Sequence, residues 1–371
     1  MTSRDTSEAC RGWIASVLRG EGGADLPATE DVVVATAKDE GVAPLLLDAL
    51  ADSPPAVRDA AAALTPRLVA VMRDQVAVEM LRAIEARRVT DALLGAGVPF
   101  LVLKGAALAY RVYERPHHRP RCDLDLLMPA VTVVESARPL LESLGYEASS
   151  VQIDTLMTNE TPFRRQAPGG KVHWIDAHWA LTNNALFGTR FGYDELLRES
   201  VALPGFAPDA RGLGDVHALI HACLHRVANM PHSMGDRLIW LYDILLLAKR
   251  LPPGDWERLA ELAADRGVAG PVLGGLEAAG RWLSCPQPVH VLQLLRQAAM
   301  NERFDMRRAH RRSHLEWHNF LSIPRRLRAR WMWKNLFPSP AYIEAWRDDR
   351  GPVAAADYWR RLRRITGFFR D

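Results

Sequence analysis

The chain has 371 residues, of which 48% are apolar and 25% are charged, and its net charge is +3. This composition is ordinary for a soluble globular protein, and the length exceeds what one small hydrophobic core can serve, so we expect two or three domains. The longest apolar stretch, 238–248, is interrupted by Asp243 well short of a membrane span, so no membrane protein is expected. The first residues contain no apolar signal core, and we therefore expect a cytoplasmic protein.

Residues 1–95 are predicted to form an N-terminal helical region. Short segments with apolar residues at helical spacing are separated there by Gly, Pro and Ser. A longer helix is expected over 66–94, because Pro66 suits the first helical position and Thr65 can cap it. Gly95-Ala-Gly97 is expected to end this helix.

Residues 96–210 are predicted to form a separate domain in which short strands alternate with helices. Strands are predicted at 98–103, 122–128, 146–151, 162–166 and 171–179, and helices at 105–113 and 130–144. Pro168-Gly-Gly170 predicts a hairpin between the last two strands. The expected fold class is therefore α+β.

Residues 211–335 are predicted to form a C-terminal helical domain, and 336–371 a basic tail. Helices are expected at 215–228, 235–250, 255–266, 269–283 and 288–300. From Arg303 to the end, 17 Lys and Arg stand against 7 Asp and Glu, with tryptophans interleaved. Such a segment either binds a phosphate-rich partner or an acidic peptide, or forms a solvated helical surface whose Trp rings pack inward.

The cysteines offer no metal site or disulfide framework. They are far apart and show no CxxC spacing: Cys10, Cys122, Cys223 and Cys285. A reducing compartment fits this pattern.

The most informative motif is Lys104-Gly105, followed 18 residues later by Asp123-Leu-Asp125. Gly105 lies where a predicted strand turns into a helix, and the two aspartates lie within an apolar strand. Residues i and i+2 of a strand point to the same side, so both carboxylates face one place. They repel each other unless a divalent cation is bound between them, and a helix N-terminus nearby can bind phosphates. The motif therefore predicts a phosphoryl-transfer site.

A third carboxylate is available on the strand predicted at 171–179, where Asp176 and His178 share a face. If this strand lies beside that of Asp123 and Asp125, Asp176 reaches the same place, and three carboxylates serve two-metal phosphoryl transfer. Mg²⁺ (or Mn²⁺) suits a site of carboxylate and phosphate oxygens. His178 is expected to orient Asp176 or to contact the substrate; otherwise it is a hydrogen-bonded, half-buried histidine.

Three motifs together resemble a known family. They are Lys104-Gly105, Arg119-x-x-x-Asp123-Leu-Asp125 and Ile175-Asp176-Ala177-His178-Trp179. In this order they resemble the polymerase-β-like nucleotidyltransferase superfamily and, within it, a bacterial branch of uncharacterised nucleotidyltransferases. The resemblance covers about residues 65–250 and implies a mixed sheet with flanking helices. It also implies the site residues: Asp123, Asp125 and Asp176 as metal ligands, and Gly105 as the phosphate-binding turn.

Three basic side chains near these motifs are candidates for binding the nucleotide. Lys104 is expected to contact phosphate; the alternative is a lysine that extends from a strand edge into solvent. Arg119 and Arg121 flank the aspartates, and they either bind the triphosphate or neutralise the carboxylates.

Histidines recur every four residues at His217, His221 and His225. Such spacing places three rings on one helical face, but the outer two are ~12 Å apart at a rise of ~1.5 Å per residue, so they cannot share one ion. His221 and His225 are candidates for contacting the substrate, or for an adjacent pair of metal ligands. The alternative is the polar side of a helix that faces a cleft.

The expected function is Mg²⁺-dependent transfer of a nucleoside monophosphate from an NTP, with release of pyrophosphate. The acceptor is unidentified: a small molecule, a peptide, a protein or tRNA. Ala106 stands where the superfamily has a second Gly or a Ser, and this supports an alternative, a catalytically inactive nucleotide- or peptide-binding module. A further and less favoured alternative uses the basic tail to bind RNA.

Overall fold

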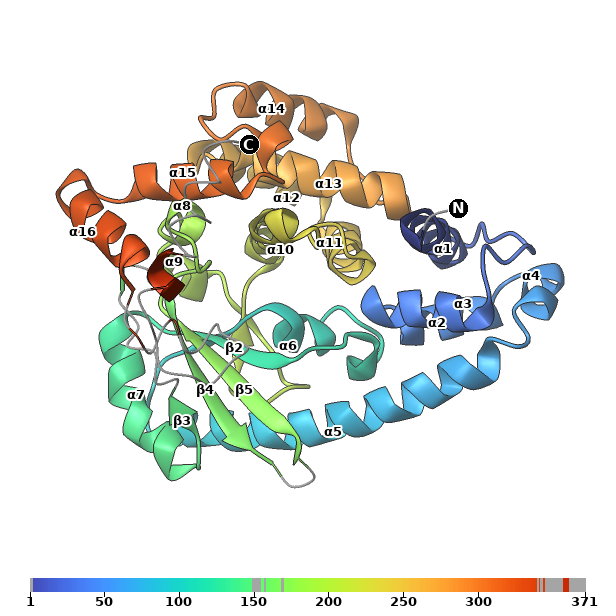
Figure 1. Ribbon diagram of the computed structural model, residues 1–371, viewed down its shortest axis with the longest axis horizontal. Coiled ribbons are helices and arrows are strands. Elements are labelled where there is room, and N and C mark those ends of the chain that lie inside the picture. The colour runs from blue at the N-terminus through green and yellow to red at the C-terminus, as the bar shows by residue number, and fades with distance from the viewer. Residues whose placement is uncertain are drawn as a thin grey trace.

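The computed structural model describes residues 3–148, 155–156, 158–167, 170–338, 340, 343 and 356–359. Within them, no helix has both the length and the apolar character needed to cross a membrane. Figure 1 shows a sheet that lies between the long helix α5, at the lower edge, and the helices α10 and α11 above it.

The N-terminal segment is helical, as the sequence predicts. Its helices are α1 (Ser3–Leu18), α2 (Glu30–Asp39), α3 (Ala43–Ala51), α4 (Pro55–Ala60) and α5 (Thr65–Gly95). The long helix α5 has 31 residues, with Leu64 rather than Thr65 in the capping position. The Thr65 hydroxyl instead donates back to the carbonyl of Ala61 at 3.5 Å, away from the free N–H groups of the helix.

The strands form one mixed sheet in the order β3-β4-β5-β2-β1-β7-β6. Their bounds are β1 Leu101–Val102, β2 Asp123–Leu127, β3 Glu147–Ala148, β4 Glu160–Gln166, β5 Val172–His178, β6 Val201–Ala202 and β7 Arg211–Gly212. The two central strands β2 and β5 are parallel, whereas β1 and β4 pair with them in the antiparallel sense. A mixed sheet with flanking helices confirms the predicted α+β class.

The strand that leads into Gly105 is shorter than predicted. A strand was expected over 98–103 and a helix over 105–113, but β1 comprises only two residues and α6 spans Lys104–Ala109. Lys104 adopts a φ of 47°, a left-handed conformation that turns the chain sharply out of the strand. Residues 149–151 of the strand predicted at 146–151, and residues 168–169 of the predicted hairpin, lie outside the described residues.

The C-terminal segment is helical as predicted. Its main helices are α10 (Asp215–Asn229), α11 (Leu238–Arg250), α12 (Pro253–Asp265), α13 (Ala269–Leu283) and α14 (Val289–Ala299). Helix α7 (Val131–Ser143) belongs to the preceding segment and lies beside the sheet. The expected helix at 235–250 begins only at Leu238, after Ser233 has adopted a φ of 57°.

The basic segment continues as α15 (Arg312–Ser322) and α16 (Arg325–Leu336). Trp317, Trp333 and Trp359 are exposed, so these rings do not pack inward as one alternative required. Trp346 and most of the tail at 336–371 lie outside the described residues.

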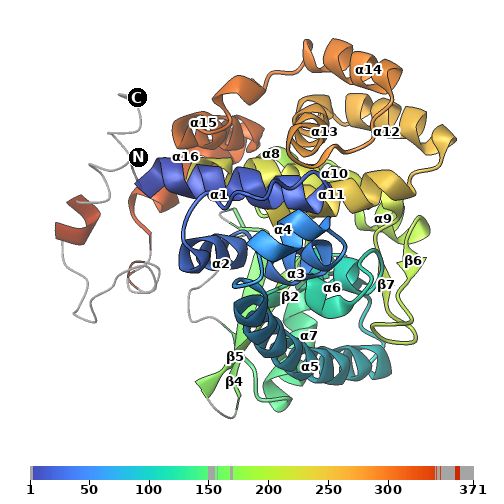
Figure 2. The ribbon, with the colours of Figure 1, turned by 90° about the vertical axis from the view of Figure 1, so that its right-hand side faces the viewer.

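The sheet separates two hydrophobic cores. On one face, Leu124, Leu126 and Ile175 belong to a core that includes residues of α5 and α7. On the other face, α1–α4 share a core with α10–α14, although the whole sheet separates them in the sequence (Figure 2). Leu127 belongs to this second core, and alternate residues of a strand share a face. The carboxylates of Asp123 and Asp125 are therefore directed to the side of α10 and α11.

Candidate active site

The turn at Lys104-Gly105 is fixed by close packing. The left-handed backbone of Lys104 is uncommon for a residue with a side chain, and such strain persists where surrounding contacts impose it. A Cβ on Gly105 would lie 3.3 Å from Arg119 Nη1 and 3.3 Å from Arg121 Cβ. The close approach of the 119–121 segment therefore favours glycine at this position.

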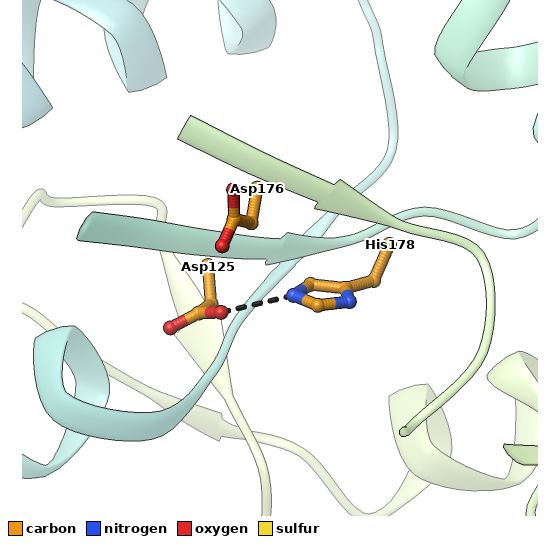
Figure 3. A group of neighbouring side chains, drawn as sticks. All are labelled: Asp125, Asp176 and His178. Atoms are coloured by element: carbon orange, nitrogen blue, oxygen red, sulfur yellow. Dashed lines mark hydrogen bonds and ion pairs between the residues drawn. The ribbon is translucent and has the colours of Figure 1, made fainter. Parts of the chain in front are cut away.

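The pairing of β2 with β5 brings Asp125 and Asp176 together, whereas Asp123 is not part of the ligand group that they form with His178. Asp125 is the register partner of Asp176, and Asp123 is the partner of Trp174. Paired residues of neighbouring strands lie on the same face, so all three carboxylates are on the side of α10 and α11. Ligand atoms of Asp125, Asp176 and His178 lie within 4.8 Å of one another (Figure 3). These three side chains form a group that could hold a metal ion.

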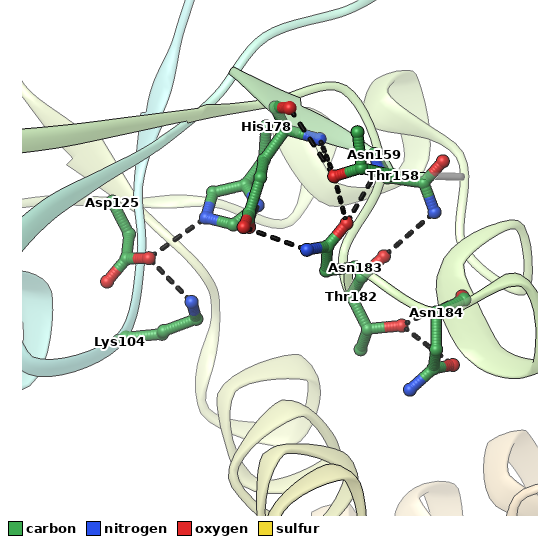
Figure 4. Close-up of polar contacts among 9 residues, drawn as sticks. Lys104, Asp125, Thr158, Asn159, His178, Thr182, Asn183 and Asn184 are labelled. Atoms are coloured by element: carbon green, nitrogen blue, oxygen red, sulfur yellow. Dashed lines mark hydrogen bonds and ion pairs between the residues drawn. The ribbon is translucent and has the colours of Figure 1, made fainter. Parts of the chain in front are cut away.

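Asp125 is the centre of the polar contacts at the site. Its Oδ1 accepts a hydrogen bond from Lys104 Nζ at 2.5 Å and lies 2.9 Å from His178 Nε2 (Figure 4). The other ring nitrogen, His178 Nδ1, lies 3.1 Å from Glu160 Oε2, within ion-pair distance but without the alignment of a hydrogen bond. Of the roles expected for His178, the structure therefore shows a buried ring held between two carboxylates.

Glu160 is a residue of this site that sequence reasoning missed. It faces His178 across the antiparallel β4–β5 pair, and its Oε1 accepts a hydrogen bond from Asn183 at 2.8 Å. The motifs of β2 and β5 do not extend to β4. The signal that could have found Glu160 is its place at the start of a strand adjacent to that of Asp176.

The carboxylates of the site differ in how their charge is balanced. Burial would raise the pKa of Asp125, but Lys104 and His178 hold it well below its usual range. The Asp125 charge, together with burial, raises the pKa of Asp123 to about 6. Burial and then the charges of Asp125 and Glu160 raise the pKa of Asp176 to about 8. Within the described residues, no cationic side chain forms an ion pair with Asp123 or Asp176. The site carries more negative charge than its own cations balance.

This surplus of carboxylate fits a bound divalent cation. The raised pKa values of Asp123 and Asp176 mean that these carboxyl groups tend to keep their protons. A bound cation would compensate the negative charge of the carboxylates in place of those protons. Oxygen ligands predominate, and these are the ligands of hard cations such as Mg²⁺.

Asp123 and Asp125 open into a cavity of about 190 Å³ between the Lys104-Gly105 turn and the two helices α10 and α11. Asp123 and Asp125 line one side. The helix side is lined by His221, His225, Trp240 and Asp243. The cavity therefore gives a substrate access to Asp123 and Asp125, whereas Asp176 and His178 are not among its lining residues.

The structure pairs Arg119 and Arg121 with carboxylates other than those of the motif. Arg119 makes a two-pronged contact with Asp243 of α11, with Nη2 to Oδ2 at 2.7 Å. Arg121 pairs with Glu79 of α5 at 2.9 Å. All four side chains are buried. Both arginines line the cavity, but their charges are already matched by these carboxylates rather than by Asp123 and Asp125. The sequence could have indicated Asp243 as a buried ion-pair partner, because it is the one acidic residue in the apolar stretch 238–248. No comparable pattern marks Glu79, which lies inside the long helix α5.

The three histidines of α10 separate into two environments. His221 and His225 line the cavity, whereas His217 lies 3.2 Å from Glu199 on another side. Burial lowers the pKa of His221 to about 3, so this ring is neutral at physiological pH. The His225 ring packs edge-on against Trp240, with 4.6 Å between the ring centroids. His221 and His225 thus offer neutral hydrogen-bonding groups to whatever enters.

The mixed sheet, the parallel β2–β5 pair and the acidic group beside the cavity fit a nucleotidyltransferase fold. Residues 27–284 match the family described as uncharacterised nucleotidyltransferase, and the chain belongs to this family. No match to a curated protein was found. Membership implies a nucleoside triphosphate as substrate and leaves the acceptor open.

Proposed function

We propose that this protein transfers a nucleoside monophosphate from an NTP to an acceptor, in a reaction that depends on Mg²⁺ or Mn²⁺. The observation that carries the proposal is the register pairing of Asp125 with Asp176, with Asp123 on the same face. In the proposed reaction, a nucleophilic oxygen of the acceptor forms a bond to the α-phosphorus. The bond from that phosphorus to the β-phosphate oxygen breaks, and pyrophosphate leaves.

Asp123, Asp125 and Asp176 are the residues that we assign to the metal ions. Bound cations would neutralise phosphate charge and lower the pKa of the attacking hydroxyl. His178 keeps the Asp125 carboxylate in place through the 2.9 Å contact. With a cation bound, Asp176 would be deprotonated and would act on the acceptor hydroxyl through that ion, and the hydroxyl proton would pass to solvent.

Lys104 is assigned to the phosphates of the nucleotide. Its ammonium group lines the cavity and contacts Asp125. Movement of this flexible side chain toward a phosphate would offset the charge that develops on the leaving group. Arg119 and Arg121 are assigned a supporting role, because their ion pairs with Asp243 and Glu79 hold the cavity wall next to Gly105.

The direct test is incubation of the protein with each α-³²P-labelled NTP, Mg²⁺ and a cell extract. We expect a labelled acceptor with wild-type protein and none with Asp125→Asn or Asp176→Asn. Asp209→Asn, an exposed aspartate without an ion pair, is the matched control and should label as wild type does. Equal labelling by wild type and both site variants would refute the assignment of these residues.

A second readout separates metal binding from catalysis. Mn²⁺ titration in the presence of a non-hydrolysable NTP, followed by electron paramagnetic resonance, should show bound metal in wild type and in Asp209→Asn, and weaker binding in Asp176→Asn.

One observation favours a second candidate, a nucleotide-binding module without catalysis. Ala106, next to Gly105, is buried and offers no hydroxyl to a phosphate. In that case Mg²⁺ with one NTP would raise the melting temperature, Asp125→Asn would abolish the shift, and no labelled acceptor would appear.

A further inference from the structure

A second cavity adjoins the proposed catalytic cavity and has the opposite electrostatic character. Its volume is about 380 Å³, within the ~300–1,000 Å³ typical of ligand pockets. The segment 119–122, which directly precedes Asp123, lines both cavities. A ligand in the second cavity would therefore lie next to the strand that carries the aspartates.

The second cavity is basic and has no acidic lining residue in the part of the chain that the structure describes. Besides Arg119 and Arg121, its lining contains four cationic side chains from separate elements or loops: Lys38 of α2, Arg82 of α5, Lys171 before β5, and Arg237 before α11. Segments far apart in the sequence thus converge to concentrate positive charge at one place.

These four cations differ from Arg119 and Arg121, which line both cavities, in having no carboxylate partner among the described residues. Lys38, Arg82 and Lys171 form no ion pair with any described residue. The Arg237 guanidinium donates to the backbone carbonyl of Asp39 and lies over the Trp240 ring, but it too has no carboxylate partner among the described residues. By contrast, Arg119 is matched by a buried carboxylate. Positive charge gathered without compensation weakens the fold, so a bound anion is the natural counterpart.

Two further features of the lining fit an anionic ligand. Burial, and to a lesser degree the Arg121 charge, lowers the pKa of Arg82, so its positive charge lies in an unfavourable environment. The buried amide nitrogen of Gln75, another lining residue, is a hydrogen-bond donor without an acceptor among the described residues. A phosphate offers oxygens that accept from both types of donor.

We infer that the cavity bounded by Lys38, Arg82, Lys171 and Arg237 binds a phosphate group of a substrate. The inference rests on the proposed function for its biological meaning, since a phosphate held there lies beside the site of nucleotidyl transfer. Two substrates can supply the group: the NTP, through its β- and γ-phosphates, or an acceptor that is itself phosphorylated. The recognition chemistry is the same in both cases.

The first test measures binding of inorganic tripolyphosphate by calorimetry, without metal. We expect saturable binding that weakens at high salt, and a dissociation constant roughly tenfold higher or more in Arg82→Gln/Lys171→Gln, because two charge-assisted contacts are lost. Lys171→Gln alone changes an exposed side chain and should bind about threefold more weakly or worse without loss of fold. The control Arg198→Gln/Lys249→Gln, which removes two exposed cations elsewhere, should stay within about twofold of wild type.

Failure of this inference is distinguishable from failure of the proposed function. Asp125→Asn should retain tripolyphosphate binding, since Asp125 does not line the second cavity. Absence of binding to wild type, or equal affinity in wild type and the Arg82/Lys171 variant, would overturn the phosphate site whether or not the enzyme transfers nucleotides.

A second measurement identifies the source of the phosphate. Each NTP is titrated with Mg²⁺ into wild type and into Arg82→Gln/Lys171→Gln. A weakened NTP affinity assigns the cavity to the nucleotide. An unchanged NTP affinity, with lost tripolyphosphate binding, assigns it to a phosphorylated acceptor, and both results support the site.

Discussion

Asp176 is held in the folded protein without a counter-charge, and this has a cost that depends on pH. Its pKa rises to about 8 in the fold, whereas an unfolded chain releases this proton near the ordinary value of 3.8. Below about pH 4 both states hold the proton. As the pH rises toward 8, only the folded state still binds the proton, so this group makes the protein progressively less stable.

We therefore expect Asp176→Asn to stabilise the metal-free protein increasingly with pH. The gain in free energy of unfolding should be small at pH 4.5 and roughly 2 kcal/mol at pH 8, after allowance for partial exposure. Urea unfolding at both pH values measures it, and Asp209→Asn is the control. A gain that is the same at both pH values would contradict the assigned charge state.

Gly105 tests how tightly the turn is packed. In Gly105→Ala the new methyl group meets the 119–121 segment at 3.3 Å, and ion pairs to α11 and α5 prevent that segment from moving away. We expect a loss of about 1 kcal/mol in stability and a larger proportional loss of activity. Thermal melts and the labelling assay measure the two effects. Gly12→Ala, in a helix with open space around Cα, should be neutral or stabilising.

For single residues, the sequence predicted which side chains lie on the same face of a strand, but it did not predict their contact partners in the folded protein. The spacing of Asp123 and Asp125, and of Asp176 and His178, follows from the two-residue period of a strand. The pairing of β2 with β5 depends on the tertiary fold. So do the partners of Arg119 and Arg121, which lie more than forty residues away on helices.

At the scale of secondary-structure elements, the carboxylate of Glu85 connects helix α5 to the sheet by hydrogen bonds. Glu85 accepts hydrogen bonds from Arg165 of β4, at 2.6 and 2.9 Å, and from the Tyr146 hydroxyl at 2.7 Å. Burial would raise the pKa of Glu85, but these donors and Arg88 lower it to about 2. Its contribution to stability is therefore complete above the unfolded value of 4.5 and is lost as the pH falls toward 2.

Glu85→Gln should cost about 2 kcal/mol at neutral pH, less than a fully buried pair because Arg165 and Arg88 are partly exposed. The difference from wild type should shrink at pH 3. Urea unfolding at the two pH values measures it. Glu135→Gln, which breaks the more exposed Glu135–Arg138 pair, should cost under about 0.5 kcal/mol at either pH.

The helices were more predictable than the strands, for a physical reason. The long helix α5 shows its period over many residues, and its predicted and observed bounds differ by one residue at each end. The strand before Gly105 has only two paired residues, since its length is set by the turn at Lys104 and by neighbours. No local sequence pattern therefore predicts that β1 is only two residues long.

At the scale of the whole molecule, the sheet and the C-terminal helices are connected by an ion pair in the wall of the catalytic cavity. The Arg119–Asp243 pair links the loop before β2 to α11, and so links the sheet to the C-terminal helices. The sequence did not reveal that α1–α4 belong to the core of those helices. There, Arg11 lies over the Trp282 ring at 4.2 Å from its centroid, and no repeat or spacing signals so distant a contact.

A double-mutant cycle should show strong coupling in this link. Asp243→Asn alone should cost about 3 kcal/mol, because it leaves a buried guanidinium uncompensated. Adding Arg119→Met should recover part of the loss, with a coupling energy of about 2 kcal/mol. The exposed Arg296–Glu277 pair, changed in the same way, should couple by less than about 0.5 kcal/mol. Simple additivity at Arg119 and Asp243 would contradict this account.

The ammonium group of Lys104 donates a hydrogen bond to an Asp125 oxygen that the proposed metal ion would need as a ligand. Lys104 and the metal ion would therefore compete for this oxygen. A metal ion that arrives alone has to displace the ammonium group and leave a charged amine without a partner. An ion that arrives with a triphosphate supplies new oxygens for that amine. Occupancy of the site should therefore be conditional on the nucleotide. Mn²⁺ titrations with and without a non-hydrolysable NTP should show much weaker binding of the ion alone.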